Sequence, residues 1–234
     1  MEKALSSQAL VRSLSKDGSV HVTDEFYNTL ISGTAAFVFL LASIALIFLS
    51  VQAHKSLHVI AFTVYGLAVV NLFIASALHH GVDGTEELEH SLRQYDYYSI
   101  SLMIAGTFTP LCLILLRNSF GWMILGIMWF LAIAGILLKM IFPHLPKWIS
   151  TSVFIGMGWI GVLIAKPLYQ LSPYALGLMA LGGLFYTVGA VIFSIEKPNP
   201  LPGRFGFHEI WHLFVVAGAA SHFAVIYLFI SALP

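Results

Sequence analysis

Histidines that could bind one metal ion lie at two distant points of the chain. His208 and His212 are four residues apart in the run His-Glu-Ile-Trp-His, where a strongly apolar segment begins. On a helix this spacing puts both rings on one face, where they can share a metal. Another apolar segment ends at His79 and His80, which supplies a third imidazole. The pattern predicts a metal site built between helices in a lipid bilayer.

His80 is a better ligand candidate than its neighbour His79. Ser76 and His80 are four residues apart and share a helix face, whereas His79 is rotated by about 100° and is expected to point elsewhere. His222 lies about 21 Å beyond His208 along a helix axis, too far to bind the same metal. We expect His222 to be a buried histidine with its own hydrogen bond.

Three imidazoles and a water form a zinc site of the catalytic kind, because zinc favours tetrahedral nitrogen coordination and an open fourth position activates water. A carboxylate must then accept the proton. Asp96 is expected at the same membrane level, at the start of the third apolar segment, and is the candidate base. Ser76 is placed to hydrogen-bond the water or a substrate carbonyl.

A zinc protease is a competing interpretation, since His208 to His212 also matches the pattern H-E-x-x-H, in which Glu209 would be the general base. No acidic residue follows Glu209, however, and Val215 stands where one protease class has glycine. His222 is out of reach. The protease interpretation therefore lacks a third ligand downstream.

The composition indicates a polytopic membrane protein. Apolar residues make up 59% of the chain and charged residues 9%, compared with about a quarter charged in soluble domains. The net charge is zero, so nothing points to nucleic acid as a partner. Cys112 is the only cysteine, which excludes an intramolecular disulfide.

Seven apolar segments are long enough to cross a bilayer, which needs about 20 residues. The predicted fold is an all-α membrane protein: a segment 1–28 followed by one seven-helix domain, 29–234. An acidic loop from Gly81 to Tyr95 and a loop from Pro167 to Pro173 are among the expected connections. The predicted spans are 29–51, 58–80, 96–116, 119–138, 148–166, 174–195 and 207–232.

Basic residues predict the orientation, because Lys and Arg concentrate in cytoplasmic loops. The side of the N-terminus carries eight of the eleven: Lys3, Arg12, Lys16, Arg93, Lys139, Lys147, Lys197 and Arg204. The other side has Lys55, Arg117 and Lys166. The N-terminus, with segment 1–28, is therefore expected in the cytoplasm and Pro234 outside, which puts the histidines near the inner face.

Several short motifs, in this order, resemble the haemolysin III family, the bacterial branch of the progestin and adipoQ receptor superfamily. The motifs are Asp24-Glu25-Phe26-Tyr27-Asn28, Ser76 with His80, Asp96-Tyr97 leading to Ala105-Gly106-Thr107-Phe108-Thr109-Pro110, the run from Gly182 to Ala190, and Phe207 to His212. The resemblance covers nearly the whole chain. It implies a multi-pass protein of the bacterial cell membrane.

The resemblance also implies a zinc ion held by His80, His208 and His212, with a water near Asp96 and Ser76. It further implies kinship with alkaline ceramidases, which cleave the amide of a sphingolipid. One position departs from the family pattern: Ser32 stands where histidine is common. A role for the first span at the site is therefore open.

Three functions compete. The first is a zinc-dependent hydrolase of a lipid amide or ester, which would act on a ceramide-like or other acyl lipid. The second is a non-enzymatic sensor of membrane lipids in which zinc is structural, since both kinds of site use the same three histidines. The third is a lytic pore, which would need a polar stripe along several helices. The fourth to sixth spans offer only scattered small polar residues, so the pore ranks last.

Overall fold

Helices account for nearly all of the chain that the computed structural model describes, namely Lys16 and residues 25–142 and 146–234. Seven helical segments are long and apolar enough to cross a membrane, and the expected all-α class is confirmed. The elements are α2 (Glu25–Gln52), α3 (Ser56–Gly81), α4 (Glu86–Pro110) with η1 (Leu111–Leu116), α5 (Ser119–Ile141), α6 (Lys147–Trp159) with η2 (Ile160–Ile164) and α7 (Ala165–Leu171), α8 (Pro173–Ile195), and α9 (Phe207–Val225) with η3 (Ile226–Ile230).

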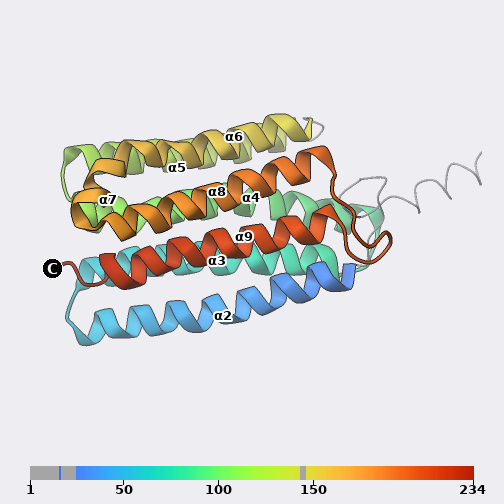
Figure 1. Cartoon of the computed structure of the whole chain (residues 1–234). Coiled ribbons are helices and arrows are strands. Elements are labelled where there is room, and N and C mark those ends of the chain that lie inside the picture. Colours follow the sequence, from blue (N-terminus) through green and yellow to red (C-terminus); the bar gives the residue numbers. More distant parts are fainter. Residues whose placement is uncertain (1–15, 17–24, 143–145) are drawn as a thin grey trace, which may run out of the picture.

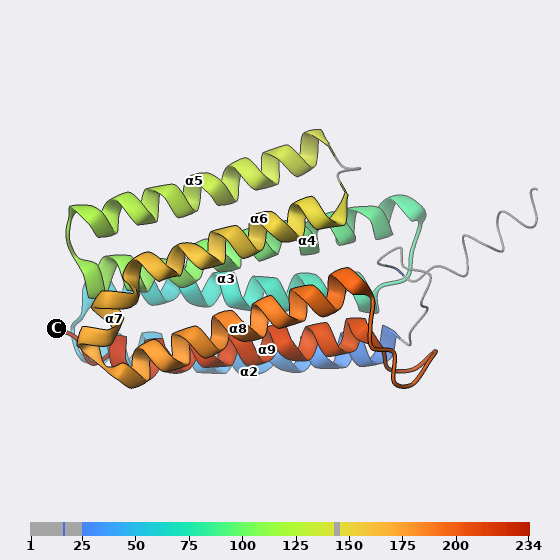
Figure 2. The same cartoon turned by 45° about the horizontal axis from the view of Figure 1, so that its top comes forward.

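The spanning helices lie side by side along one common direction (Figures 1 and 2). Helix α3 packs between α2 and α4, while α8 packs along α9, which also contacts α2. The start of α2 lies at one end of the bundle and the C-terminus at the opposite end (Figure 1). Which end faces the cytoplasm stays a prediction, and residues 1–15 and 17–24 of the expected cytoplasmic segment lie outside the described residues.

The expected acidic loop before the third span is wrong, because α4 begins at Glu86. Thr85 caps this helix: its hydroxyl accepts a hydrogen bond from the Leu88 amide at 3.3 Å. Glu86, Glu87 and Glu89 in the first turn are favourable at the positive end of a helix dipole. The acidic run therefore starts a helix, and Asp96 lies well inside it rather than at its first residue.

The expected loop from Pro167 to Pro173 is also mostly helical. The fifth span passes from α6 through the 3₁₀ segment η2 into α7, which continues to Leu171. Pro167 cannot donate a backbone hydrogen bond, which accounts for the change of helix type just before it. Only Ser172 separates α7 from α8, and its hydroxyl accepts from the Tyr174 amide at 3.2 Å.

Small residues allow the central helices to approach closely, as is common between helices in membranes. A Cβ atom added at Gly106 of α4 would lie 2.4 Å from the Cβ of Ala68 on α3. Large apolar side chains such as Leu67, Phe130 and Ile141 are exposed on the outside of the bundle, where lipid chains would surround them. The polar side chains are concentrated inside, and most of them meet at one end.

Candidate metal and hydrolytic site

Three histidines from two helices meet inside that end of the bundle. His80 is in the last turn of α3, while His208 and His212 are in the first two turns of α9. All three are buried, and one ring nitrogen of each lies within 4.8 Å of the others. The Nε2 atoms of His80 and His212 are 3.2 Å apart. The structure thus brings together the three residues that the sequence singled out, and their role as ligands stays a prediction.

This geometry fits a tetrahedral zinc ion. With Zn–N bonds of about 2.0–2.1 Å, two nitrogen ligands of one zinc lie about 3.3 Å apart. The separation of 3.2 Å between His80 and His212 corresponds to that spacing. The rings of His80 and His208 are also close, with centroids 4.8 Å apart. The cluster therefore needs only small side-chain rotations to hold one ion.

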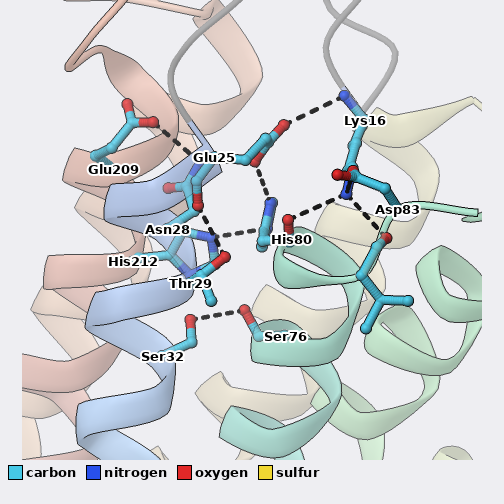
Figure 3. Close-up of polar contacts among 11 residues, drawn as sticks. Lys16, Glu25, Asn28, Thr29, Ser32, Ser76, His80, Asp83, Glu209 and His212 are labelled. Atoms are coloured by element: carbon cyan, nitrogen blue, oxygen red, sulfur yellow. Dashed lines mark hydrogen bonds and ion pairs between the residues drawn. The ribbon is translucent and has the colours of Figure 1, made fainter.

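Glu25, the first residue of α2, contacts the ring of His80 on the side opposite His212 (Figure 3). Its Oε2 lies 2.6 Å from Nδ1 of His80. A carboxylate can only accept, so Nδ1 of His80 donates and carries the ring proton. The lone pair of Nε2 is then on the side of His212, whose Nε2 lies 3.2 Å away. Metal-bound histidines commonly have such a carboxylate partner, which fixes the tautomer and the ring orientation.

The N-terminal side of the chain adds a further layer of contacts. Lys16 Nζ donates to the backbone carbonyls of His80 and Val82, at 3.1 and 2.9 Å. It also forms an ion pair with Asp83 at 2.7 Å, and the hydrogen bond and charge of Lys16 lower the pKa of that carboxyl. Lys16 therefore caps the end of α3 that carries His80, next to Glu25 (Figure 3).

Glu209 is fully buried but has a structural role rather than that of a protease base. Its Oε2 accepts from the backbone amide of Gly206 at 2.6 Å, which caps the start of α9. Its Oε1 accepts from Nδ2 of Asn28 at 2.9 Å. Asn28 also donates to Glu25 at 3.2 Å and so joins the two carboxylates. Both carboxylate oxygens of Glu209 thus accept hydrogen bonds from other groups, and Glu209 is not part of the histidine cluster, which argues against the H-E-x-x-H interpretation.

The first span, α2, also contributes Ser32 to this region. The hydroxyls of Ser32 and Ser76 are 2.8 Å apart, and both side chains are buried (Figure 3). Glu25, Asn28 and Ser32 follow one another at helical spacing on one face of α2. This face is directed towards the ends of α3 and α9 that carry the histidines.

Asp96 lies on α4 on the other side of α3, and His79 lies beside it. One ligand atom each of His79, His80 and Asp96 lie within 4.8 Å of one another. His79 thus lies outside the three-histidine group, as its rotation from His80 predicts, but close to Asp96. His79 is buried, and its Nδ1 finds no hydrogen-bond partner among the described residues. Neighbouring positions on α3 face different partners because this helix is enclosed on several sides.

A cavity of about 530 Å³ extends from this cluster into the bundle. The polar side chains at its near end are Ser76, His79, Arg93, Asp96, His208 and His212. Most of the rest of its wall is apolar, with residues of α3, α4, α6, α7, α8 and α9 such as Phe73, Phe108 and Leu168. Its volume falls in the range of small-molecule pockets, about 300–1,000 Å³. His208 and His212 of the histidine cluster thus line the polar end of a largely apolar cavity.

The sequence did not indicate the contacts of Glu25, Asn28 or Arg93. Glu25 and Asn28 belong to one of the motifs that carry the family resemblance, and this motif is the sequence signal that marks them.

His222 lines the far part of the cavity and is partly buried, and its Nε2 donates to the Met179 carbonyl at 3.2 Å. The expected hydrogen bond of His222 is therefore present.

Fold and site together define a class: multi-pass integral membrane proteins of seven helices, with a buried histidine cluster at one end of the bundle. The family model described as haemolysin-III related matches residues 20–223. The chain belongs to this family.

The relatives in this family are bacterial and eukaryotic. The chain is 38% identical to hemolysin-3 of Bacillus cereus over 210 residues, which is 89% of this chain and 93% of the relative. It is 32% identical to a hemolysin-3 homolog of Bacillus subtilis (strain 168), over 91% of this chain and 97% of the relative. It is 26% identical to the human monocyte to macrophage differentiation factor, over 73% and 71%. The distant match supports the wider superfamily, and the bacterial relatives indicate the cell membrane.

Proposed function

We propose that this protein is a zinc-dependent hydrolase that cleaves an amide or ester bond of a membrane lipid. The observation that carries the proposal is the cluster of His80, His208 and His212, since the two histidines of α9 line a largely apolar cavity together with Asp96 and Ser76. A sensor with a structural zinc would need only the histidines. A cavity that leads to them from an apolar interior gives a lipid access to the same point.

The histidines have the role of metal ligands. His80, His208 and His212 would hold zinc through ring nitrogens, with Glu25 behind His80. When bound, zinc polarises a carbonyl and makes water acidic enough to react near neutral pH. His208 and His212, two of the residues that would hold the ion, both line the cavity in which a substrate would be bound.

Asp96 has the role of general base. Its carboxylate lines the cavity close to the histidine pair of α3. It would accept a proton as the oxygen of water bonds to the lipid carbonyl carbon. It would return that proton to the nitrogen or oxygen that leaves when the amide or ester bond breaks. Such a base contributes about 10² to 10⁴-fold in rate.

Ser76 has the role of positioning the substrate carbonyl. Its hydroxyl lines the cavity and lies 2.8 Å from that of Ser32. If Ser32 donates this hydrogen bond, the Ser76 hydroxyl is left to donate to a carbonyl oxygen. Ser32 would then orient Ser76.

The substrate class follows from the apolar wall and the membrane setting. An acyl chain would fill the apolar part of the cavity, and its carbonyl would lie at the histidines. Ceramide-like lipids and other acyl lipids of the bilayer meet this description. The cationic side chain of Arg93 at the polar end suits a phosphate or carboxylate near the scissile bond.

The test combines metal analysis with a lipid screen on purified protein. About one zinc per chain is expected, and His212→Ala should remove most of it. The matched control is His54→Asn, because His54 is exposed at the opposite end and asparagine tolerates its positive φ of 55°. Full zinc content in a His80, His208, His212 triple-alanine variant would contradict the metal assignment.

The same preparations distinguish the hydrolase from the sensor. Once a cleaved lipid is found, Asp96→Asn should retain zinc and lower the rate by at least about 100-fold. Glu87→Gln, which changes an exposed carboxylate in the first turn of α4, is the control. Unchanged turnover in Asp96→Asn would exclude Asp96 as the base. If no lipid is cleaved and zinc removal lowers only the unfolding temperature, the sensor becomes the better explanation.

A further inference from the structure

A second group of polar side chains lies in the same cavity, farther from the histidine cluster. Tyr186 of α8 and His222 of α9 both line it, with ring centroids 5.5 Å apart. The Tyr186 hydroxyl is buried and finds no hydrogen-bond partner in residues 25–142 and 146–234. His222 donates through Nε2 to the Met179 carbonyl, so Nδ1 carries the lone pair that can accept a hydrogen bond from a ligand. The wall around them is otherwise largely apolar.

Tight packing fixes both rings. A Cβ atom at Gly218 of α9 would lie 2.8 Å from the ring of Tyr186. A Cβ atom at Gly182 of α8 would lie 2.4 Å from the ring of His222. Each aromatic ring thus lies directly against the backbone of the other helix, and neither could turn away from the cavity without losing this contact. The two polar groups are held in place before any ligand arrives.

A hydroxyl without a partner in an apolar interior costs free energy, because it has lost its bonds to water. The Tyr186 hydroxyl and Nδ1 of the nearby His222 ring form a set of donors and acceptors in this part of the cavity. A ligand hydroxyl could satisfy this set, because it can both donate and accept.

Helix geometry gives the distance from the histidine cluster to this polar group. Gly218, under Tyr186, and His222 lie six and ten residues beyond His212. At 1.5 Å per residue these steps are about 9 and 15 Å along α9. An extended chain of single bonds advances about 1.2 Å per bond. The polar group therefore lies about 8 to 12 bonds from a carbonyl at the cluster.

We propose that Tyr186 and His222 form a subsite for a hydroxyl group in the middle of a lipid acyl chain. This inference rests on the proposed function, since the distance is counted from a carbonyl held at the histidines. The chain runs from the histidine cluster along α9, and its mid-chain hydroxyl donates to or accepts from Tyr186 and His222. The preferred lipids are then those hydroxylated about 8 to 12 bonds from the carbonyl, rather than plain saturated ones.

The experiment measures binding to full-length, zinc-loaded protein in lipid nanodiscs. Tritiated octadecanoic acid is the tracer, and 10-hydroxyoctadecanoic, 2-hydroxyoctadecanoic and unlabelled octadecanoic acid compete with it. The mid-chain isomer is expected to bind about fivefold to tenfold more tightly than the other two, the gain from one additional hydrogen bond.

Tyr186→Phe should abolish this preference while leaving the affinity for octadecanoic acid unchanged. The variant is expected to fold, because it removes only a hydroxyl without a partner. Thr187→Val is the matched control: Thr187 also lines the cavity, but its hydroxyl already donates to the Gly183 carbonyl at 2.8 Å. This control should keep the preference for the mid-chain isomer.

Three results would overturn the subsite: equal binding of the isomers, a preference that survives Tyr186→Phe, or no binding of any acid. Hydrolysis is measured separately, so the two proposals fail separately. If the protein prefers the mid-chain isomer but cleaves no lipid, the subsite proposal is supported and the hydrolase proposal is contradicted. If the protein cleaves a lipid but does not prefer the mid-chain isomer, the hydrolase proposal is supported and the subsite proposal is contradicted.

Discussion

The contact between Glu25 and His80 gives the sharpest quantitative prediction. A bond of 2.6 Å from a ring nitrogen to a carboxylate is a short, charge-assisted one. The Glu25 side chain is 23% exposed, so solvent screens it only in part. Loss of such an outer partner typically lowers metal affinity by about 10 to 100-fold, or roughly 1.4 to 2.7 kcal/mol.

Two substitutions of Glu25 separate the effect of its charge on zinc affinity from the effect of its hydrogen bond to His80. In Glu25→Gln the amide oxygen can still accept from His80, so only the charge is lost and zinc affinity should fall about tenfold. In Glu25→Ala the bond is lost as well and the fall should approach about 100-fold. Competition against a chromophoric chelator measures the affinity of the purified protein. Glu87→Gln, at the exposed start of α4, removes one carboxylate at the same end of the bundle and should change nothing.

The refuting result is equally specific. Circular dichroism and thermal unfolding of the metal-free proteins establish that each variant retains its fold. If Glu25→Ala then binds zinc as tightly as the parent, Glu25 does not orient His80 for a metal. If the alanine variant matches the glutamine variant, the hydrogen bond adds nothing beyond the charge.

Three further outcomes are expected. Gly218→Ala should lower the free energy of unfolding by about 1–3 kcal/mol, because its Cβ would lie 2.8 Å from the Tyr186 ring; unchanged thermal unfolding in detergent would contradict this packing. Ser32→Ala should keep zinc but slow hydrolysis by up to about tenfold, since one hydrogen bond to Ser76 is lost; a kinetic comparison with the parent decides. An activity reporter fused after Pro234 should act outside the cytoplasm, and cytoplasmic activity would show that the orientation is wrong.

The histidines of α9 could be predicted from sequence because their relation is local. His208 and His212 are one helical turn apart, so any helix puts them on one face. His80 could be predicted because it stands at the end of an apolar segment whose level follows from the topology. The seven spans could be predicted because bilayer thickness fixes their length.

The structure differs from the sequence predictions where the composition of a segment and its position in the bundle favour different conformations. The charge of the acidic run around Glu87 favours a loop, whereas Thr85 followed by acidic residues is typical of the start of a helix. Asp96 was consequently placed at a helix start. The rotation of about 100° between neighbours predicts that His79 points elsewhere than His80, and His79 indeed lies outside the three-histidine group but close to Asp96. Because α3 is enclosed by several helices, His80 faces the α9 histidines while its neighbour lies beside α4.

The contacts of Glu25 and Asn28 could not be derived from spacing. They join residues 55 and 181 positions apart in the chain, and only the packing of α2 against α3 and α9 brings them together. Sequence periodicity describes one helix at a time and contains no information on which helices become neighbours. The family motif at these positions indicated that they matter without indicating why.

The division of the cluster between α3 and α9 has a consequence for biosynthesis. Two of the three imidazoles are on the most C-terminal of the spanning helices, while the third and its carboxylate partner are near the beginning of the chain. During translation, His80 and Glu25 enter the membrane before His208 has been made. The three-histidine cluster is therefore incomplete until α9 has been made, and a ribosome that stalls before α9 leaves a membrane fragment without it.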